Sequence, residues 1–173
     1  MYPFGTCELS MNRGYVKMTP KKAEWSTIVF DTVPKEMYTN DWTHKYLSFM
    51  ICSDTAAKGR VMLSDLGGKR QKIVDVEFTA EWQRIIIDLS DVQGWYKKDE
   101  DGNFTVPADV SPYSPEGNSF YGGFKFSLSG SSVCRSYHFD YFGLFADRSA
   151  AESYSVLANE GDDYKSTLMN EDE

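Results

Sequence analysis

Residues 136–147 read Ser-Tyr-His-Phe-Asp-Tyr-Phe-Gly-Leu-Phe-Ala-Asp, and this stretch decides the fold of the chain. A run this rich in aromatic and aliphatic residues must lie in a core, and its aromatic content favours a central β-strand over a helix. Asp140 stands in the middle of the run. An unpaired carboxylate in an apolar interior is very costly. Asp140 must therefore be solvated at an edge, paired, hydrogen-bonded or bound to a metal ion.

Strand signals dominate the rest of the chain. β-forming runs, several of them alternating with a period of two, predict further strands at 14–18, 25–31, 46–53, 60–64, 72–78, 82–89 and 121–128. Turn signals such as 65–68 and 101–102 separate them. One helix is predicted at about 147–157, with Asp147 or Ser149 as its N-cap. Strands without intervening helices predict an all-β, antiparallel two-sheet β-sandwich, a jelly roll at this length, with a short C-terminal helix.

Composition sets the limits on size and partners. The 173 residues are enough for one domain with a substantial core. The net charge is −8, and residues 159–173 supply −5 of it, because six acidic residues there face one lysine. We therefore divide the chain into a β-sandwich at 1–157 and an acidic tail or linker at 158–173. A mildly acidic body without a basic stripe argues against nucleic acid or an anionic membrane as partner.

Targeting signals and cysteines add little. No run approaches 18 apolar residues, so we expect no membrane insertion. No signal-peptide pattern opens the chain, which predicts a cytosolic protein or a mature or excised piece of a larger secreted one. The three cysteines have no metal-ligand spacing. Cys52 is most simply a small core residue, and whether Cys7 and Cys134 form a disulfide stays open.

Four motifs occur in a suggestive order. They are Gly-Tyr-Val-Lys-Met at 14–18, Lys-Tyr-Leu-Ser-Phe-Met at 45–50, Glu-Trp-Gln-Arg-Ile-Ile-Ile-Asp-Leu-Ser at 81–90, and Phe-Asp-Tyr-Phe-Gly-Leu-Phe-Ala-Asp at 139–147, followed by Ala-Ala-Glu-Ser-Tyr at 150–154. Their order resembles that of non-catalytic carbohydrate-binding modules of the galactose-binding-like, jelly-roll kind, as found in secreted or surface glycan-degrading proteins of gut anaerobic bacteria. The resemblance covers about residues 10–155.

The resemblance implies a biological setting. We expect a polysaccharide or oligosaccharide partner, an extracellular or cell-surface location, and a place in a larger multimodular protein. The resemblance does not give the glycan, because binding residues in such modules differ and sit in variable loops.

Two irregular stretches, 35–44 and 90–119, are rich in aromatic residues. Long loops inside compact domains are commonly functional. A sugar ring has an apolar face and polar edges, so proteins hold it with an exposed aromatic plane and with polar side chains that bind its hydroxyls. We therefore predict that a sugar stacks on Trp95, on Trp42 or on both. The alternative for Trp95 is a loop tryptophan folded back as a plug over the end of the sandwich.

The full set of predicted ligand-binding residues is Trp95, Tyr96, Trp42, Tyr113, Tyr121, Trp82, Arg84, Asp99 and His44. Trp82 looks structural in the modules that the chain resembles. Arg84 and Asp88 share its strand face, so all three contact a glycan if that face is the concave surface of a sheet. Whether the site is an end-loop pocket or a sheet-face groove stays open.

Two stretches suggest calcium. Residues 99–103 resemble a calcium loop, but their spacing departs from the pattern, and Asp101-Gly102 is more simply a tight turn. In many jelly-roll modules an acidic residue of the last strand joins N-terminal oxygens around a structural calcium ion. The resemblance thus implies Asp140 and Glu8 as metal ligands. The alternative is Asp140 hydrogen-bonded to backbone N–H groups or paired with a basic side chain.

No catalytic motif is present. The chain lacks Gly-x-Ser-x-Gly, His-Glu-x-x-His, a phosphate loop and a dinucleotide fingerprint. Many carboxylates are present, yet nothing singles out a pair suited to glycoside hydrolysis. We therefore predict a binding module and not an enzyme. The alternatives are a structural or adhesion β-sandwich with a protein partner and a small jelly-roll hydrolase or lyase.

Overall fold

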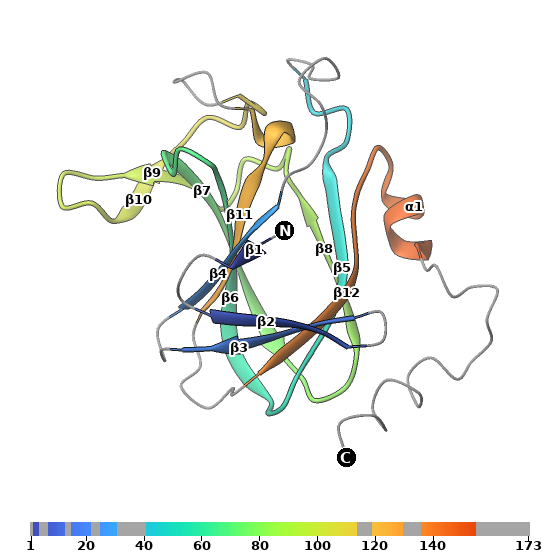
Figure 1. The fold of residues 1–173 in the computed structure, drawn as a ribbon. Coiled ribbons are helices and arrows are strands. Elements are labelled where there is room, and N and C mark those ends of the chain that lie inside the picture. The colour runs from blue at the N-terminus through green and yellow to red at the C-terminus, as the bar shows by residue number, and fades with distance from the viewer. Residues whose placement is uncertain are drawn as a thin grey trace.

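A computed structural model describes residues 2–3, 7–12, 15–21, 25–30, 41–113, 119–129 and 136–154. These residues form a β-sandwich of two facing sheets, which confirms the predicted fold class (Figure 1). Within this described part, no helix is long and apolar enough to cross a bilayer. The predicted tail and Cys134 lie outside the described residues.

The larger sheet, sheet A, has seven strands. In spatial order they are β1 (Tyr2–Pro3), β4 (Trp25–Phe30), β11 (Phe124–Ser129), β6 (Ala57–Asp65), β7 (Arg70–Phe78), β9 (Trp95–Lys98) and β10 (Phe104–Pro107). The smaller sheet, sheet B, has five: β2 (Cys7–Asn12), β3 (Tyr15–Pro20), β12 (Tyr137–Phe145), β5 (Tyr46–Ser53) and β8 (Gln83–Asp88). Every described pairing is antiparallel, and strands from distant parts of the sequence alternate, as a jelly roll requires.

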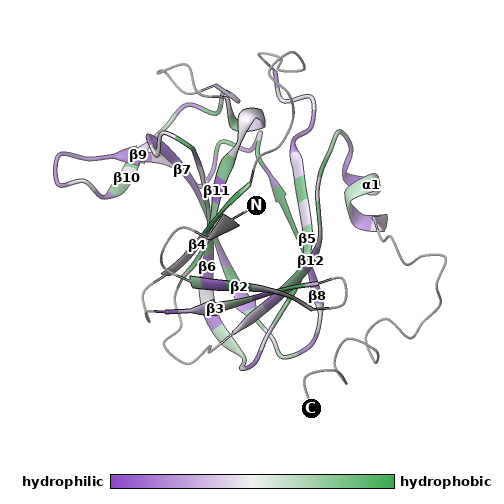
Figure 2. Ribbon diagram, viewed as in Figure 1, coloured by the Kyte–Doolittle hydropathy of each residue, from purple (hydrophilic) through white to green (hydrophobic). Residues whose placement is uncertain are grey.

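Phenylalanine rings fill the space between the sheets. The Phe142 ring of sheet B stacks on Phe49 at 5.0 Å between centroids and on Phe30 of sheet A at 4.3 Å. Phe126 meets Phe49 edge to face at 5.2 Å. The alternation predicted for β7 and β11 is confirmed, because their inward residues belong to this core. Figure 2 shows the resulting apolar stripes along the strands.

The stretch that contains Asp140 is the central strand of sheet B, as predicted, with β3 on one side and β5 on the other. A β-bulge interrupts its pairing with β5 between Asp140 and Gly143, and Tyr141 adopts a left-handed φ of 54°. In a regular strand Phe139 and Phe142, three residues apart, would point to opposite faces. The extra residue in the bulge turns Phe142 back, so that both rings face the core. The Asp140 carboxylate accepts the Tyr141 N–H at 2.7 Å. This hydrogen bond confirms the backbone alternative for Asp140.

Helix α1 (Arg148–Ser153) follows β12 and lies against the outer face of sheet B (Figure 1). Its predicted N-cap is confirmed, since the Asp147 carboxylate accepts the Ala150 N–H at 2.8 Å. Arg84 of β8 holds the other end, because its guanidinium donates to the carbonyl oxygens of Ala151 and Tyr154. Carbonyls at a helix C-terminus lack partners within the helix, and a cation suits them.

The prediction of an irregular loop at 90–119 is wrong in part. Residues 95–98 and 104–107 pair as the hairpin β9–β10, and β9 also pairs with β7. The hairpin therefore extends sheet A and projects from the body of the sandwich (Figure 1). The turn predicted at Asp101-Gly102 closes it, with Gly102 at a φ of +84°.

Gly94, which precedes β9, is tightly constrained. It has a φ of +80°, and a Cβ there would lie 2.6 Å from the Ile73 carbonyl oxygen. Gly102 has a similar φ of +84°, with open space around its Cβ position. We expect Gly94→Ala to lower the free energy of unfolding by about 3 kcal/mol or more, and Gly102→Ala by only about 1 kcal/mol. Urea unfolding of both variants measures the difference, and equal losses would contradict the close approach.

Candidate functional site

Trp95 is a core residue and not a binding platform. Alternation along β9 points it inward, where its side chain is 2% exposed and its Nε1 donates to the Leu89 carbonyl at 2.9 Å. A ring so buried offers no face to a sugar. The prediction that a sugar stacks on Trp95 is therefore wrong, and the plug alternative describes this residue.

Trp42 completes the plug. Its half-buried ring lies 6.2 Å from Trp95, 5.6 Å from Phe120 and 5.8 Å from Tyr121, and its Nε1 donates to the Val110 carbonyl. Phe120 and Tyr121 belong to a 3-10 helix, η2 (Phe120–Gly122). These rings close one end of the sandwich, so the structure favours packing over sugar stacking for Trp42.

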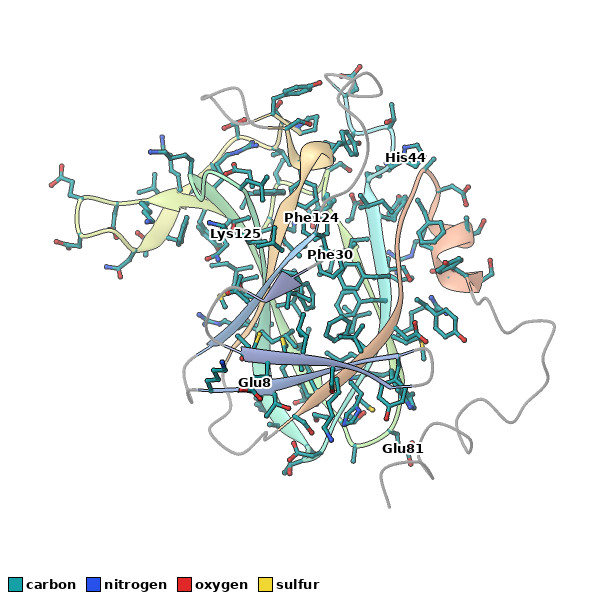
Figure 3. All side chains as sticks on the ribbon, viewed as in Figure 1. Glu8, Phe30, His44, Glu81, Phe124 and Lys125 are labelled. Carbon is teal, nitrogen blue, oxygen red and sulfur yellow. The ribbon has the colours of Figure 1, made fainter. Side chains whose placement is uncertain are left out.

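Three further predicted residues surround this plug. Tyr121 is 3% exposed, which excludes it as a platform, and its hydroxyl accepts the His44 backbone N–H at 3.1 Å. His44 itself is exposed at this end of the molecule (Figure 3). Tyr113 is half-buried and forms an isolated bridge with Ser119. The structure brings these residues to one end of the sandwich, and none of them lines a recess formed by the described residues.

Trp82 and Arg84 have structural roles. Trp82 is 7% exposed and packs edge to face on Tyr15 at 5.9 Å, on the outer side of sheet B. Arg84 is half-buried, and its Nη1 donates to Ser48 Oγ at 2.9 Å in addition to the α1 carbonyls. Helix α1 thus occupies the face on which we predicted a glycan for these two residues, so neither is retained as a binding residue.

Asp99 holds the β9–β10 turn. Its carboxylate accepts the Asp101 and Asn103 N–H groups at 3.0 and 2.9 Å, and Thr105 Oγ1 donates to it at 2.6 Å. The hydrogen bond from Thr105, followed by that from Asn103, lowers the pKa of Asp99 below its ordinary value. The carboxylate therefore serves the turn, and the tight-turn interpretation of this segment is confirmed.

Glu8 and Asp140 do not share a metal site. Glu8 of β2 lies opposite Thr19 of β3. Phe139, the neighbour of Asp140 in β12, lies opposite Val16 on the other side of β3. Thr19 and Val16 are three residues apart along β3, which corresponds to roughly 10 Å. Glu8 lies 3.5 Å from Lys21 instead. Among the described residues no group of three or more histidine, cysteine or acidic side chains could hold a metal ion. Calcium binding elsewhere stays a prediction.

Tyr96 is the predicted residue that points away from the core beside a recess. It follows Trp95 in β9 and therefore points to the outer face of sheet A, where it is half-buried. Successive pairings put Tyr96, Gln71, Ser64 and Lys125 in one row across β9, β7, β6 and β11. Figure 3 shows Lys125 and Phe124 on opposite sides of β11, with Phe124 toward the core.

A recess of about 700 Å³ lies beside Tyr96; we call it the flank recess. It is lined by Lys72, Ile73, Val74, Asp75, Ile86, Ile87, Asp88, Asp91, Val92, Gln93, Gly94, Trp95, Tyr96, Pro107 and Arg148. It therefore joins residues from both faces of β7 and β9 to the edge strand β8 and the 91–94 turn. Aliphatic side chains, two aromatic rings, three carboxylates, an amide and two cations line it. Such a mixture suits a ligand with apolar faces and many hydroxyls.

Lys72 fixes one wall of the flank recess. Its buried Nζ donates to the Asp91 carbonyl at 2.9 Å and to the Gln93 carbonyl. Burial lowers the pKa of Lys72, and the charges of Asp91 and Asp88 oppose that shift. The ammonium group thus holds the 91–93 turn against β7. Sequence reasoning missed Ile73, Gln93 and Arg148 because only the fold brings them together.

Comparisons with known proteins agree with this architecture. No protein-family model and no curated protein matches the chain. Among solved structures, a family 11 carbohydrate-binding module from Clostridium thermocellum, in complex with a β-1,3-1,4-mixed-linked tetrasaccharide, aligns with a TM-score of 0.52 and 14% identity over 83% of this chain and 86% of that chain. A mutant of a family 29 carbohydrate-binding module aligns with a TM-score of 0.50 and 10% identity over 89% and 84%. The fold is that of carbohydrate-binding β-sandwiches.

One alignment involves a much longer chain. The structure of PfGH50B matches with a TM-score of 0.50 and 10% identity, over 83% of this chain but only 22% of that one. A sandwich of this shape therefore occurs as one part of a larger polypeptide.

The pKa of Asp99 gives a test of the hairpin geometry. A carboxyl whose pKa is lowered by folding stabilises the fold above its unfolded-state pKa, and this contribution is lost as the pH falls through the folded-state value. We expect Asp99 to titrate below ordinary aspartates in an NMR pH titration, and Thr105→Val to raise its pKa. Asp147, whose pKa is lowered chiefly by the Ala150 N–H, is the internal control. An Asp99 pKa unchanged by Thr105→Val would contradict the assigned cause.

The plug predicts a stability effect. Trp95→Ala should lower the free energy of unfolding by about 3–5 kcal/mol, because it empties a fully packed site. Chemical denaturation measures this loss. A variant as stable as the wild type would show that Trp95 does not pack as described.

Proposed function

We propose that the chain is a non-catalytic carbohydrate-binding module that binds a polysaccharide or oligosaccharide on the outer face of sheet A. The observation that carries this proposal is the flank recess with the outward-facing, half-buried Tyr96 ring at its side. A pyranose packs its C–H face on Tyr96, and its hydroxyls reach the carboxylates and the amide of the recess.

The two sheet faces differ in a way that supports this location. The outer face of sheet B is partly covered by α1, which Arg84 and Ser48 hold through the Ala151 carbonyl. The outer face of sheet A carries no helix among the described residues. Of the two arrangements left open above, this favours a sheet-face groove over an end-loop pocket.

The setting of the module is part of the proposal. The family 11 and family 29 modules that share this fold support a sugar partner, and the partial match to PfGH50B supports a place in a larger protein. An extracellular or cell-surface location follows, because large polysaccharides lie outside the cell. The module would hold its parent protein on the glycan without reacting with it.

Affinity electrophoresis against a panel of plant and host polysaccharides tests the function, followed by calorimetry on each glycan that binds. Retarded migration on at least one glycan is the expected result. Unretarded migration on every glycan would contradict the proposed sugar binding and favour a protein partner. Release of reducing ends from a bound glycan would instead support the hydrolase alternative.

Tyr96 variants test the site. Tyr96→Ala removes the stacking surface and should weaken binding by about 1–2 kcal/mol, roughly 5- to 30-fold in Kd. Tyr96→Phe keeps the ring and should retain most of the affinity.

The matched control is Tyr113→Ala, because Tyr113 is also half-buried but lines neither recess described for this chain. Equal losses in Tyr96→Ala and Tyr113→Ala, with both variants folded, would show that the glycan does not bind at Tyr96.

A further inference from the structure

A second recess lies where β7 begins and β9 ends. It encloses about 530 Å³ and is lined by Gly67, Gly68, Lys69, Arg70, Lys97, Lys98 and Asp109; we call it the lysine recess. Arg70 of β7 pairs with Lys97 of β9, directly beside the pair of Gln71 and Tyr96. Side chains alternate along a strand, so Arg70 and Lys97 point to the side of sheet A opposite to Tyr96, whereas Lys98, two residues after Tyr96, lies on the outer face with it.

The charge of this recess opposes that of the chain. Four of its side chains are basic and one, Asp109, is acidic, whereas the chain as a whole carries −8. Asp109 Oδ2 is already 3.0 Å from Arg70 Nη1. Salt screens exposed charges beyond about 8 Å at physiological ionic strength. A ligand inside the recess is therefore governed by the nearby lysines and not by the distant acidic residues.

Arg70 fixes one wall of the recess. Its side chain is 3% exposed, and its guanidinium lies 5.4 Å from the Trp95 ring. In the hydrogen bonds described for Arg70, Nη1 donates to three acceptors: the Asp109 carbonyl, Asp109 Oδ2 and the Ser111 carbonyl. Nε makes no hydrogen bond within the described part of the chain and lies 3.7 Å from Asp65 Oδ2. This guanidinium is buried between the Asp65 and Asp109 carboxylates, so it stiffens the wall of the recess and leaves the exposed lysines to meet a ligand.

The Gly67-Gly68 turn lines the other side of this recess. Gly68 has a φ of +66°, and a Cβ built on it would lie 3.9 Å from Lys125 Nζ. A fifth cation thus stands next to the turn. Lys125 also belongs to the outer row that runs from Tyr96 through Gln71 and Ser64. The basic groups therefore flank the surface on which we place the glycan.

We propose that the lysine recess binds an oxyanion carried by the glycan, either a uronate carboxylate or a sulfate ester, while a neighbouring ring packs on Tyr96. This inference rests on the proposed function. It narrows the ligand from glycans in general to acidic glycans. Exposed lysines supply the attraction, and the buried Arg70 holds the wall of the recess in place.

Pairs of polysaccharides that differ only in charge test this inference. Polygalacturonate is compared with its fully methyl-esterified form, and chondroitin sulfate with desulfated chondroitin, by calorimetry on the full chain at 50 and 200 mM salt. The double variant Lys97→Gln/Lys98→Gln removes two exposed charges of the recess. Lys58→Gln is the matched control, since Lys58 is an exposed lysine on β6 outside both recesses.

We expect the wild type to bind one acidic member at least tenfold more tightly than its neutral partner. The double variant should lose most of that preference, whereas Lys58→Gln should keep it. Preference for polygalacturonate assigns the carboxylate, and preference for chondroitin sulfate assigns the sulfate.

Two outcomes overturn the inference and are distinguishable. Binding to neutral glycans alone, or an acidic preference that survives in the double variant, contradicts the lysine recess and leaves the proposed function standing. Absence of binding to every glycan, acidic or neutral, contradicts both.

Discussion

The burial of Trp95 is the contact on which the binding surface depends. Its ring packs into the core next to Trp42 and Phe120, and its indole N–H is satisfied by the Leu89 carbonyl. A tryptophan that buries 150–250 Å² contributes about 4–6 kcal/mol. That contact fixes β9 against β7, and because side chains alternate along a strand, it sends Tyr96 to the outer face. A residue with no exposed ring face thus positions the residue that we propose as the sugar platform.

The same contact organises the charges around the site. Arg70 lies over the Trp95 ring and also joins the β6–β7 turn, through Asp65, to the 109–111 segment. A buried guanidinium is tolerated because carboxylates and carbonyls surround it. On sheet B the half-buried Arg84 plays a comparable structural part, because its guanidinium donates to the α1 carbonyls and holds the helix against the outer face. Among the described residues no α-helix covers the outer face of sheet A, and basic side chains border this face beside Tyr96, which is the physical basis for placing the glycan there.

The scaffold could be predicted well from the sequence because local patterns of residues determine most of its strands and its helix. Alternation in β7 and β11 identified the core face, the aromatic run identified β12 as a central strand, and Asp147 identified the start of α1. The candidate site was predicted less well. β9 and β10 are only four residues long and form through pairing with β7, which is remote in sequence. Nothing near Trp95 reveals that Arg70 and Trp42 enclose its ring. Tyr96 was predicted, but the recess beside it unites β7, β8, β9 and α1, which only the fold brings together.

The central claim is that sugar binds on the outer face of sheet A and not at the end of the sandwich. NMR mapping of backbone amide shifts during titration with an oligosaccharide of the tightest-binding glycan tests it most directly. The account predicts the largest changes at Gln71, Ile73, Gln93 and Tyr96. Changes concentrated at residues 41–45 and 119–122, around the Trp42 plug, would contradict it.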